Sequence, residues 1–474
     1  MKKILITAIG LLLFILNVHS QLSQDDQLKI DSLFEQWDHA DSPGAVLGII
    51  QNGALIYTRG YGMADLEHDI PIDQHSVFYI GSVSKQFVTM CILLLEEQGK
   101  LDLDDEIQVH LPDFPRYDDP LTIRHFIHHT SGVRDYLTLW YLSGKDYMDY
   151  IDEDDVYALI KRQKTLNFTP GDRYLYSNSC YFMLAMIVEE ASGVSIKEFA
   201  RVNLFEPLGM VNSHFHDDYL HLIKNRVFSY SPNDEGDTYN NLIMRFDLVG
   251  SGGVYTNVED LYLWDQNFYA NTLGSGGQAI IEKMHEEGVL NNGESAGYAF
   301  ALHNDTYRGL RTVSHGGSLA GYRSQLMRFP DHQFSVIVLA NISNFKPTAR
   351  AHEVADVLLA SQFTEEAPAK LSQNQMSDSP ATEAPPSYTA QELFKYAGNY
   401  YSDELNVFYD FIIRDNALIL FINGKELFPL RVVKPNVFAQ DRSGTISFEE
   451  DKTGEITGFS LDAGRVQNLQ FERK

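Results

Sequence analysis

The sequence predicts a mixed α/β (α+β) domain with an antiparallel sheet, followed by a linker and a small all-β domain. Apolar runs typical of buried strands occur near both ends of residues 21–363, and helical patterns lie between them. This order predicts a sheet whose edges come from the two ends of the segment, with a helical region inserted. Residues 364–389 are rich in Pro, Ser, Ala, Glu and Gln, as linkers are, and residues 390–474 contain short alternating strands.

The first twenty residues have the layout of a secretory signal. Lys2 and Lys3 precede an apolar run at 4–18, which is too short to span a bilayer comfortably. We place the mature start at Gln21 and expect an exported protein, periplasmic or secreted, with no membrane insertion after removal of the signal. An uncleaved anchor is the alternative, because His19-Ser20 is not an ideal cleavage site.

Strands at the two ends of the larger segment follow from local patterns. Apolar runs at 45–50 and 55–57 surround Asn52-Gly53, which predicts a hairpin. The run at 335–340 predicts a buried strand. Helical patterns lie between these strands, at 154–163 and 181–191.

The C-terminal segment, residues 390–474, is predicted to be a small barrel. Its strands are expected at 407–413, 418–422 and 444–448, and turn signals such as Asn423-Gly424 separate them. Binding of a small apolar ligand is one role for such a domain, although alternating Phe, Ile and Leu are expected in the core of any barrel.

The most chemically informative motif is Ser-x-x-Lys, at Ser82 and Lys85. Side chains three residues apart on a helix point the same way. A serine hydroxyl needs a neighbouring base to act as a nucleophile, and a partly desolvated lysine can lose its charge and serve as that base. The alternative is that Ser82 only caps the helix and that Lys85 is a solvated residue of its first turn.

The surroundings of this motif favour the chemical role. Apolar residues recur at helical spacing after Lys85, and Gly99 closes the helix. Ser82 is therefore expected at a helix N-terminus, where free backbone N–H groups can hold an oxyanion. A second match, from Ser343 to Lys346, is followed by Pro347, which disfavours helix at Lys346. We predict a surface loop there.

Two further motifs carry polar groups that suit a cleft. Tyr176 and Asn178 follow a Pro-Gly turn and precede a predicted helix, and a phenol near a lysine can shuttle protons. The alternative is a helix cap in which Tyr176 only packs. His315-Gly316-Gly317-Ser318 follows a short strand, and its glycines permit close approach of backbone to a substrate or an oxyanion. The alternative is an ordinary bulge or turn.

Composition excludes several classes of function. The chain has 37 Lys and Arg against 65 Asp and Glu, a net charge of -28, which argues against nucleic acid and against anionic membranes as partners. His125, His128 and His129 do not have the spacing of a metal site, so we predict no metal and no organic cofactor. Cys91 and Cys180 are expected to be buried free thiols.

Taken together, these motifs resemble the serine β-lactamase and penicillin-binding-protein superfamily, in particular the branch of class C β-lactamases, D-alanyl-D-alanine carboxypeptidases, D-aminopeptidases and β-lactamase-like esterases. Three motifs occur in the family's order, beginning at Ser82, Tyr176 and His315. Supporting segments begin at His129 and Gly250. The similarity covers roughly residues 31–362, and the trailing β domain resembles the lipocalin-like module of some members.

The resemblance implies a two-lobed β-lactamase/transpeptidase-like fold, with the site between an α/β lobe and a helical lobe. It implies Ser82 as the acylated nucleophile, Lys85 as its proton acceptor and Tyr176 as a second proton shuttle. Asn178 would bond Lys85 and the substrate amide, and the backbone N–H groups of Ser82 and Ser318 would form the oxyanion hole. A lysine and a phenol that lie close together are expected to lower each other's pKa.

One departure from the family bears on the substrate. β-Lactamases and carboxypeptidases carry a lysine where this chain has His315, which is mostly uncharged at neutral pH. Arg323 is a candidate to supply the missing charge. We therefore expect a carboxylesterase or a D-peptide hydrolase acting on a small ester or peptide, ahead of a true β-lactamase. A non-catalytic relative that binds cell-wall peptide or a protein partner is the alternative from another class.

Overall fold

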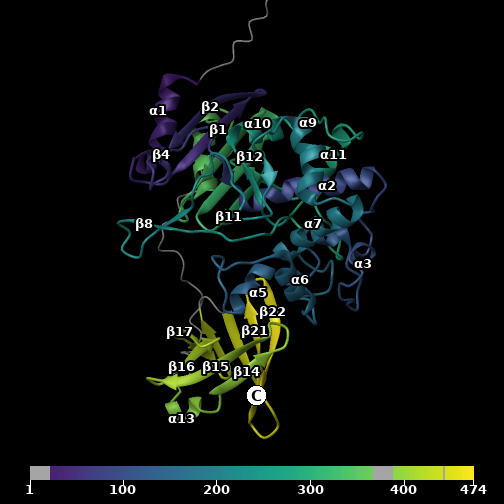
Figure 1. Ribbon diagram of the computed structural model, residues 1–474, viewed down its shortest axis with the longest axis vertical. Coiled ribbons are helices and arrows are strands. Elements are labelled where there is room, and N and C mark those ends of the chain that lie inside the picture. Colours follow the sequence, from purple (N-terminus) through teal and green to yellow (C-terminus); the bar gives the residue numbers. More distant parts are fainter. Residues whose placement is uncertain (1–21, 367–387, 441–443) are drawn as a thin grey trace, which may run out of the picture.

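The computed structural model describes residues 22–366, 388–440 and 444–474. The expected signal at 1–20 and most of the expected linker at 364–389 lie outside the described residues. The larger N-terminal body and the smaller β-rich body are both visible in Figure 1.

An antiparallel sheet of six strands forms the centre of the larger body as described, in the order β10-β11-β12-β13-β1-β2. Its strands are β1 (Ala45–Gln51), β2 (Ala54–Tyr61), β10 (His303–Tyr307), β11 (Leu310–Leu319), β12 (Tyr322–Phe329) and β13 (Phe334–Ala340). β2 forms one edge and β10 the other, which confirms the prediction that the edges come from opposite ends of the segment. The predicted β1–β2 hairpin turns at Asn52 and Gly53, both with positive φ, as a tight hairpin requires.

Both faces of this sheet are covered. In β1, the buried side chains of Ala45 and Leu47 belong to a core that includes helix α12 (Pro347–Leu358), whereas Val46 belongs to the core that includes α10 (Val258–Asn267). Alternate residues of a strand point to opposite faces, so a strand covered on both sides is a continuous apolar run. This explains why the run at 45–50 lacks polar alternation.

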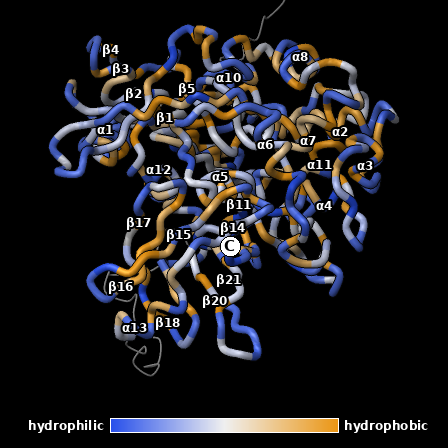
Figure 2. Tube along the Cα trace, turned by 60° about the horizontal axis from the view of Figure 1, so that its bottom comes forward, coloured by the Kyte–Doolittle hydropathy of each residue, from blue (hydrophilic) through white to orange (hydrophobic). Residues whose placement is uncertain are grey.

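The helical region packs beside the sheet around two long apolar helices, α2 (Lys85–Glu97) and α7 (Asn178–Ser192), which contact each other. Figure 2 shows their hydrophobic stretches gathered in the interior. The other helices described are α1 (Gln24–Ser32), α3 (Ile107–His110), α4 (Ile123–Ile127), α5 (Tyr136–Leu142), α6 (Glu153–Lys161), α8 (Ile196–Ala200), α9 (Glu206–Leu208) and α11 (Gln278–Met284), with the shorter turns η1 (Glu35–Trp37), η2 (Gly81–Ser84), η3 (Arg201–Phe205) and η4 (Pro330–His332).

Short strand pairs complete this body. They are β3 (Met63–Asp65) with β4 (Ile70–Pro71), β9 (Val254–Thr256) between β5 (Phe78–Tyr79) and β6 (His214–Phe215), and β7 (Tyr230–Pro232) with β8 (Tyr239–Asn241). The pairing of β5 with β9 matters most for the site, because η2 follows β5 directly.

The C-terminal domain is all-β apart from α13 (Ala390–Leu393), as predicted. Its sheet has the order β17-β16-β15-β14-β22-β21-β20-β19-β18. The strands are β14 (Gly398–Ser402), β15 (Val407–Arg414), β16 (Ala417–Ile422), β17 (Lys425–Pro429), β18 (Arg431–Lys434), β19 (Val437–Gln440), β20 (Gly444–Glu450), β21 (Ile456–Ala463) and β22 (Val466–Arg473). No ladder joins β17 to β18 within the described residues, so the sheet curls without closing, and the expected lipocalin-like barrel is not confirmed.

Two smaller expectations can also be compared with the structure. Cys91 and Cys180 are buried free thiols, as predicted. Among the described residues, no single helix combines the length and apolar composition needed to cross a bilayer. One pair, Asn178–Ser192 with Ile196–Leu208, meets those two criteria together but is bent by 77°.

Candidate active site

Ser82 lies on η2, in the short connection between β5 and α2. The predicted helix, α2, begins at Lys85. Ser82 lies three residues earlier, in the η2 turn that leads directly into α2. The N–H of Lys85 bonds the carbonyl of Ser82. The two side chains of the motif therefore come from one continuous helical turn, as the spacing predicted.

The side-chain nitrogen of Lys85 is the centre of a small hydrogen-bond network. Its side chain is fully buried, and Nζ contacts Ser82 Oγ at 3.1 Å, Asn178 Oδ1 at 3.0 Å and the Ser251 carbonyl at 2.5 Å. Burial lowers the pKa of Lys85 well below its ordinary value, and the nearby guanidinium of Arg465 lowers it further. Lys85 is therefore suited to be an uncharged amine near neutral pH.

Asp135 fixes the orientation of the Asn178 amide. Oδ2 of Asp135 accepts hydrogen bonds from the backbone N–H and from Nδ2 of Asn178, at 2.7 and 2.8 Å. Because a carboxylate only accepts, the amide nitrogen must face Asp135, and Oδ1 must face Lys85. Asp135 caps α5 as well, through Thr138, and is 1% exposed.

This arrangement assigns the lone pair of a neutral Lys85. Asn178 Oδ1 and the Ser251 carbonyl are acceptors only, so they take the two N–H groups of the amine. The remaining contact, with Ser82 Oγ, is then left for the nitrogen lone pair. A neutral amine held in this way can accept the serine proton, which is the geometry required of a general base.

Tyr176 lies against the same lysine. Lys85 Nζ is 4.9 Å from the centre of the phenol ring. The His129 ring packs against the phenol at a tilt of 40°, with 4.1 Å between ring centres, and accepts the Ser177 N–H. Burial raises the pKa of Tyr176, although the Ser82 hydroxyl and Arg465 oppose this shift. The expectation that lysine and phenol lower each other's pKa is therefore wrong for the phenol, because loss of water outweighs its neighbours.

His315 is an uncharged residue at the edge of the site. Nδ1 lies 2.6 Å from the Gly316 carbonyl and Nε2 lies 2.9 Å from the Tyr298 hydroxyl, so Nδ1 carries the proton and Nε2 accepts from Tyr298. Burial lowers the pKa of His315 to about 3. The position therefore supplies no positive charge at neutral pH, as predicted from the residue type.

Two glycines allow η2 and β11 to touch. A Cβ built on Gly317 would lie 2.0 Å from the Ile80 carbonyl oxygen, and one built on Gly81 would lie 2.7 Å from the backbone nitrogen of Ser318. Gly81 also has φ +54, which disfavours other residues. Ser82 and Ser318 are thus brought beside each other by backbone contact, the placement expected for two parts of an oxyanion hole.

These groups surround one cavity of about 640 Å³. Of the residues predicted for the site, only Lys85 does not line the cavity; it is buried and contacts Ser82. The others line it: Ser82, Tyr176, Asn178, His315, Gly317, Ser318 and Arg323. Arg323 directs Nη1 to the carbonyls of Ala320 and Tyr322 rather than to another side chain.

Sequence reasoning missed three residues of the site. Ser251 lies in the glycine-rich segment that resembles a family segment. It binds Lys85 through its backbone carbonyl, and a side-chain pattern in the sequence does not reveal such a contact. Asp135 belongs to no motif. Arg465, which also lines the cavity, comes from the C-terminal domain, where no pattern pointed to the site.

The three histidines considered for a metal are engaged with the protein. His125 Nδ1 accepts the Thr122 N–H at 3.3 Å, His128 Nδ1 lies 3.0 Å from the Tyr298 carbonyl, and His129 accepts the Ser177 N–H. In the part of the chain that the structure describes, no group of three or more His, Cys, Asp or Glu side chains is arranged to hold a metal ion.

Comparison with known proteins adds independent evidence on the fold and family. A model of the family described as Beta-lactamase matches residues 30–360. The chain is 30% identical over 333 residues to penicillin-binding protein 4* of Bacillus subtilis (strain 168), covering 68% of this chain and 73% of that protein. It is 29% identical over 330 residues to a D-aminopeptidase of Cereibacter sphaeroides (strain ATCC 17029 / ATH 2.4.9), covering 69% of this chain and 61% of that protein.

Solved structures share the fold. The octameric penicillin-binding protein homologue from Pyrococcus abyssi aligns with a TM-score of 0.64 at 22% identity, over 94% of this chain and 99% of that chain. That coverage includes the C-terminal β domain. The D-amino acid amidase from Ochrobactrum anthropi SV3, complexed with D-phenylalanine, aligns with a TM-score of 0.60 at 19% identity, over 71% of this chain and 99% of that chain.

Proposed function

Because the chain belongs to the Beta-lactamase family, we propose that it is an exported serine hydrolase that acts through an acyl-enzyme on Ser82. The observation that carries this proposal is the contact of Ser82 Oγ with the buried Lys85 Nζ at 3.1 Å, since the other two contacts of that nitrogen are acceptors. A serine paired in this way is an activated nucleophile.

The first half of the reaction forms the acyl-enzyme. Neutral Lys85 accepts the proton of Ser82 as Oγ attacks the carbonyl carbon of the substrate. The backbone N–H groups of Ser82 and Ser318 hold the negative oxygen that results. Tyr176, whose pKa is raised by burial, is protonated and can give its proton to the leaving group. Lys85 then returns the serine proton to Tyr176.

Hydrolysis of the ester on Ser82 restores the enzyme. A water molecule loses its proton to the neutral Lys85 or through Tyr176 as its oxygen attacks the acyl carbon, and the same N–H groups hold the second negative oxygen. Collapse releases the acid, and Ser82 regains a proton. No metal or organic cofactor takes part in these steps.

The substrate we propose is a small ester or a D-configured peptide or amide. Relatives named as D-aminopeptidases and a structural neighbour named as a D-amino acid amidase support this class. The neutral His315 supports it too, because efficient β-lactam recognition in this family relies on a cation at that position. We therefore expect β-lactams to be poorer substrates than activated esters.

Labelling of the nucleophile tests the proposal. We expect a fluorophosphonate and a p-nitrophenyl ester to add mass to the intact protein, and Ser82→Ala to abolish the adduct. Ser343→Ala is the matched control, because Ser343 belongs to the other Ser-x-x-Lys sequence of the chain, in the turn before α12. An adduct that survives in Ser82→Ala would overturn Ser82 as the nucleophile, and the absence of any adduct in the wild type would favour a non-catalytic binding protein.

A further inference from the structure

The C-terminal domain contributes a cation to the catalytic cavity. Arg465 lies in the turn between β21 and β22, and its guanidinium carbon is 4.6 Å from the centre of the Tyr176 ring. The Arg465 side chain is 43% exposed and lines the same cavity as Ser82 and His315. A residue from the second domain therefore covers the phenol to which we assign proton delivery.

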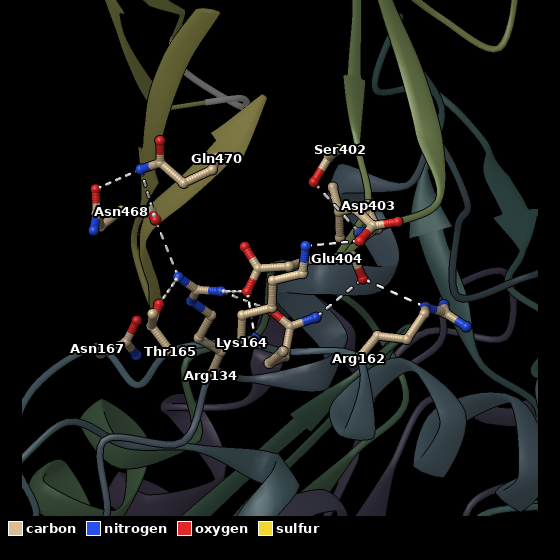
Figure 3. A network of polar contacts seen from close by, with 12 residues as sticks. Arg134, Arg162, Lys164, Thr165, Asn167, Ser402, Asp403, Glu404, Asn468 and Gln470 are labelled. Carbon is tan, nitrogen blue, oxygen red and sulfur yellow. Dashed lines mark hydrogen bonds and ion pairs between the residues drawn. The ribbon is translucent and has the colours of Figure 1, made fainter. Parts of the chain in front are cut away.

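The turn that carries Arg465 is held firmly against the larger body. The Arg465 carbonyl accepts from Asn167 Nδ2 at 3.0 Å, and Asn167 Oδ1 accepts the Gln467 N–H at 2.8 Å. Arg134, fully buried, donates to the carbonyls of Gln467 and Asn468 just beyond. Figure 3 shows Arg134 of the larger body and its contacts with Asn468 and Glu404 of the C-terminal domain. The backbone of the turn is thus anchored before any substrate binds, which reduces the conformational entropy lost when Arg465 binds a ligand.

Other charged groups at the cavity are already engaged or neutral. His315 is uncharged at neutral pH, and Arg323 bonds two backbone carbonyls. The Asp135 carboxylate accepts from Asn178 and Thr138, and it forms an ion pair with Arg465, whose Nη1 lies 3.8 Å from Oδ2. Within the described ranges, the Arg465 guanidinium donates no hydrogen bond to the protein, so the N–H groups other than those of Nη1, which pairs with Asp135, are free to bind a ligand in the cavity that Arg465 lines.

We propose that Arg465 is a specificity-determining residue that binds a carboxylate on the leaving-group side of the substrate. This rests on the proposed function, in which Tyr176 protonates the leaving group directly beneath Arg465. A planar guanidinium pairs with a carboxylate through two parallel hydrogen bonds, which fixes both charge and orientation. In this chain the positive charge absent from position 315 is supplied by the C-terminal domain.

Two aryl esters with the same acyl group test the proposal. The acetyl esters of 3-hydroxybenzoate and of 3-hydroxybenzamide differ in the charge of the leaving group and little in its shape. We expect the wild type to prefer the benzoate in kcat/KM, and Arg465→Gln to reduce that preference on the order of tenfold or more. Arg465→Lys should retain part of the preference, and added salt should weaken the preference of the wild type.

A second arginine provides the control for loss of charge. Arg431→Gln removes the same charge from β18, where the residue is exposed, and should leave the preference unchanged. Arg465 also lowers the pKa of Lys85, so its loss changes activity at a fixed pH. The kcat/KM values are therefore compared on their pH-independent plateaus. Equal loss on both esters in Arg465→Gln would indicate a merely structural role and overturn the proposal. So would a wild type that is labelled at Ser82 but does not favour the benzoate, whereas failure of the proposed function would appear as absence of labelling.

Discussion

At the scale of single residues, successive hydrogen bonds orient the side chains of the site so that the lone pair of Lys85 Nζ faces Ser82. Asp135 fixes the amide of Asn178, the amide oxygen takes one N–H of Lys85, and the Ser251 carbonyl takes another. Each contact is polar and buried, where hydrogen bonds are strong and unpaired groups are costly. Asp135 is therefore a positioning residue that acts on Ser82 through two others.

The pH dependence of acylation should separate the neighbours of Lys85. Activity requires the neutral amine, so kcat/KM rises with pH through the pKa of Lys85. Arg465 lowers that pKa and Asp135 raises it. We expect Arg465→Gln to move the acid limb of the profile to higher pH. We expect Asp135→Asn to move it to lower pH and, through misplacement of Asn178, to reduce the labelling rate at the plateau about tenfold or more.

Fluorophosphonate labelling rates measured across pH provide the readout, with Arg431→Gln as a control for loss of a distant charge. Movement of both acid limbs in the same direction would contradict the assignment of Lys85 as the base. An unshifted limb in Asp135→Asn would contradict the role of Asp135.

Which site residues the sequence could reveal depended on whether their function was local. Ser82 with Lys85, and Tyr176 with Asn178, each lie within a few residues of each other, so helical spacing and turn signals marked them. Asp135 acts through tertiary contacts made by an unremarkable helix cap, and local pattern gives such a residue no signal. The pKa of Tyr176 was predicted with the wrong sign, because sequence does not show that the phenol is fully buried.

At the scale of elements, a strand edge and a helical turn touch through backbone. β11 approaches η2 so closely that Gly317 leaves no room for a side chain against the Ile80 carbonyl. The sequence predicted a close backbone approach at Gly316-Gly317. In the structure the close approach is at Gly317, whereas Gly316 has more room. Apolar runs at the two ends of the segment predicted where the edges of the central sheet come from, although not the order of its strands. Closure of the C-terminal barrel was predicted and is not confirmed, since strand alternation does not state which edges pair.

Alanine substitutions at the two adjacent glycines should differ. In Gly317→Ala the new methyl would lie 2.0 Å from a backbone oxygen, so β11 must move away from η2 and Ser318 with it. We expect labelling of Ser82 to slow on the order of a hundredfold, the scale associated with loss of an oxyanion contact.

Gly316→Ala is the matched control, because its nearest neighbour would be the Gln325 side-chain oxygen at 3.1 Å, which needs to give only slightly. Its labelling rate should stay within a few-fold of wild type. Similar rates in the two variants would mean that the contact between β11 and η2 does not position the oxyanion hole.

At the scale of the whole molecule, the two bodies are joined by a buried charge pair. Arg134 of the larger body pairs with Glu404 of the C-terminal domain at 2.7 Å, with exposed fractions of 0% and 5%. The remaining donors of Arg134 bond Gln163, Thr165 and two β22 carbonyls, so the guanidinium is fully satisfied. Such a pair is costly to break from one side, because the charge left behind is buried without its partner.

Glu404→Gln should therefore loosen the docking of the C-terminal domain. Leaving Arg134 without its carboxylate is expected to lower the free energy of unfolding by about 3 kcal/mol, measured by urea denaturation. Glu426→Gln is the control, because its pair with Arg414 lies on the same domain but is about half exposed, so its loss should change the free energy of unfolding little. The turn carrying Arg465 is anchored by the same arginine, so Glu404→Gln should also weaken the preference for a carboxylate leaving group while Ser82 is still labelled. A stability equal to that of the control would show that the interface is held elsewhere, and an unchanged preference would show that Arg465 keeps its place without the buried pair.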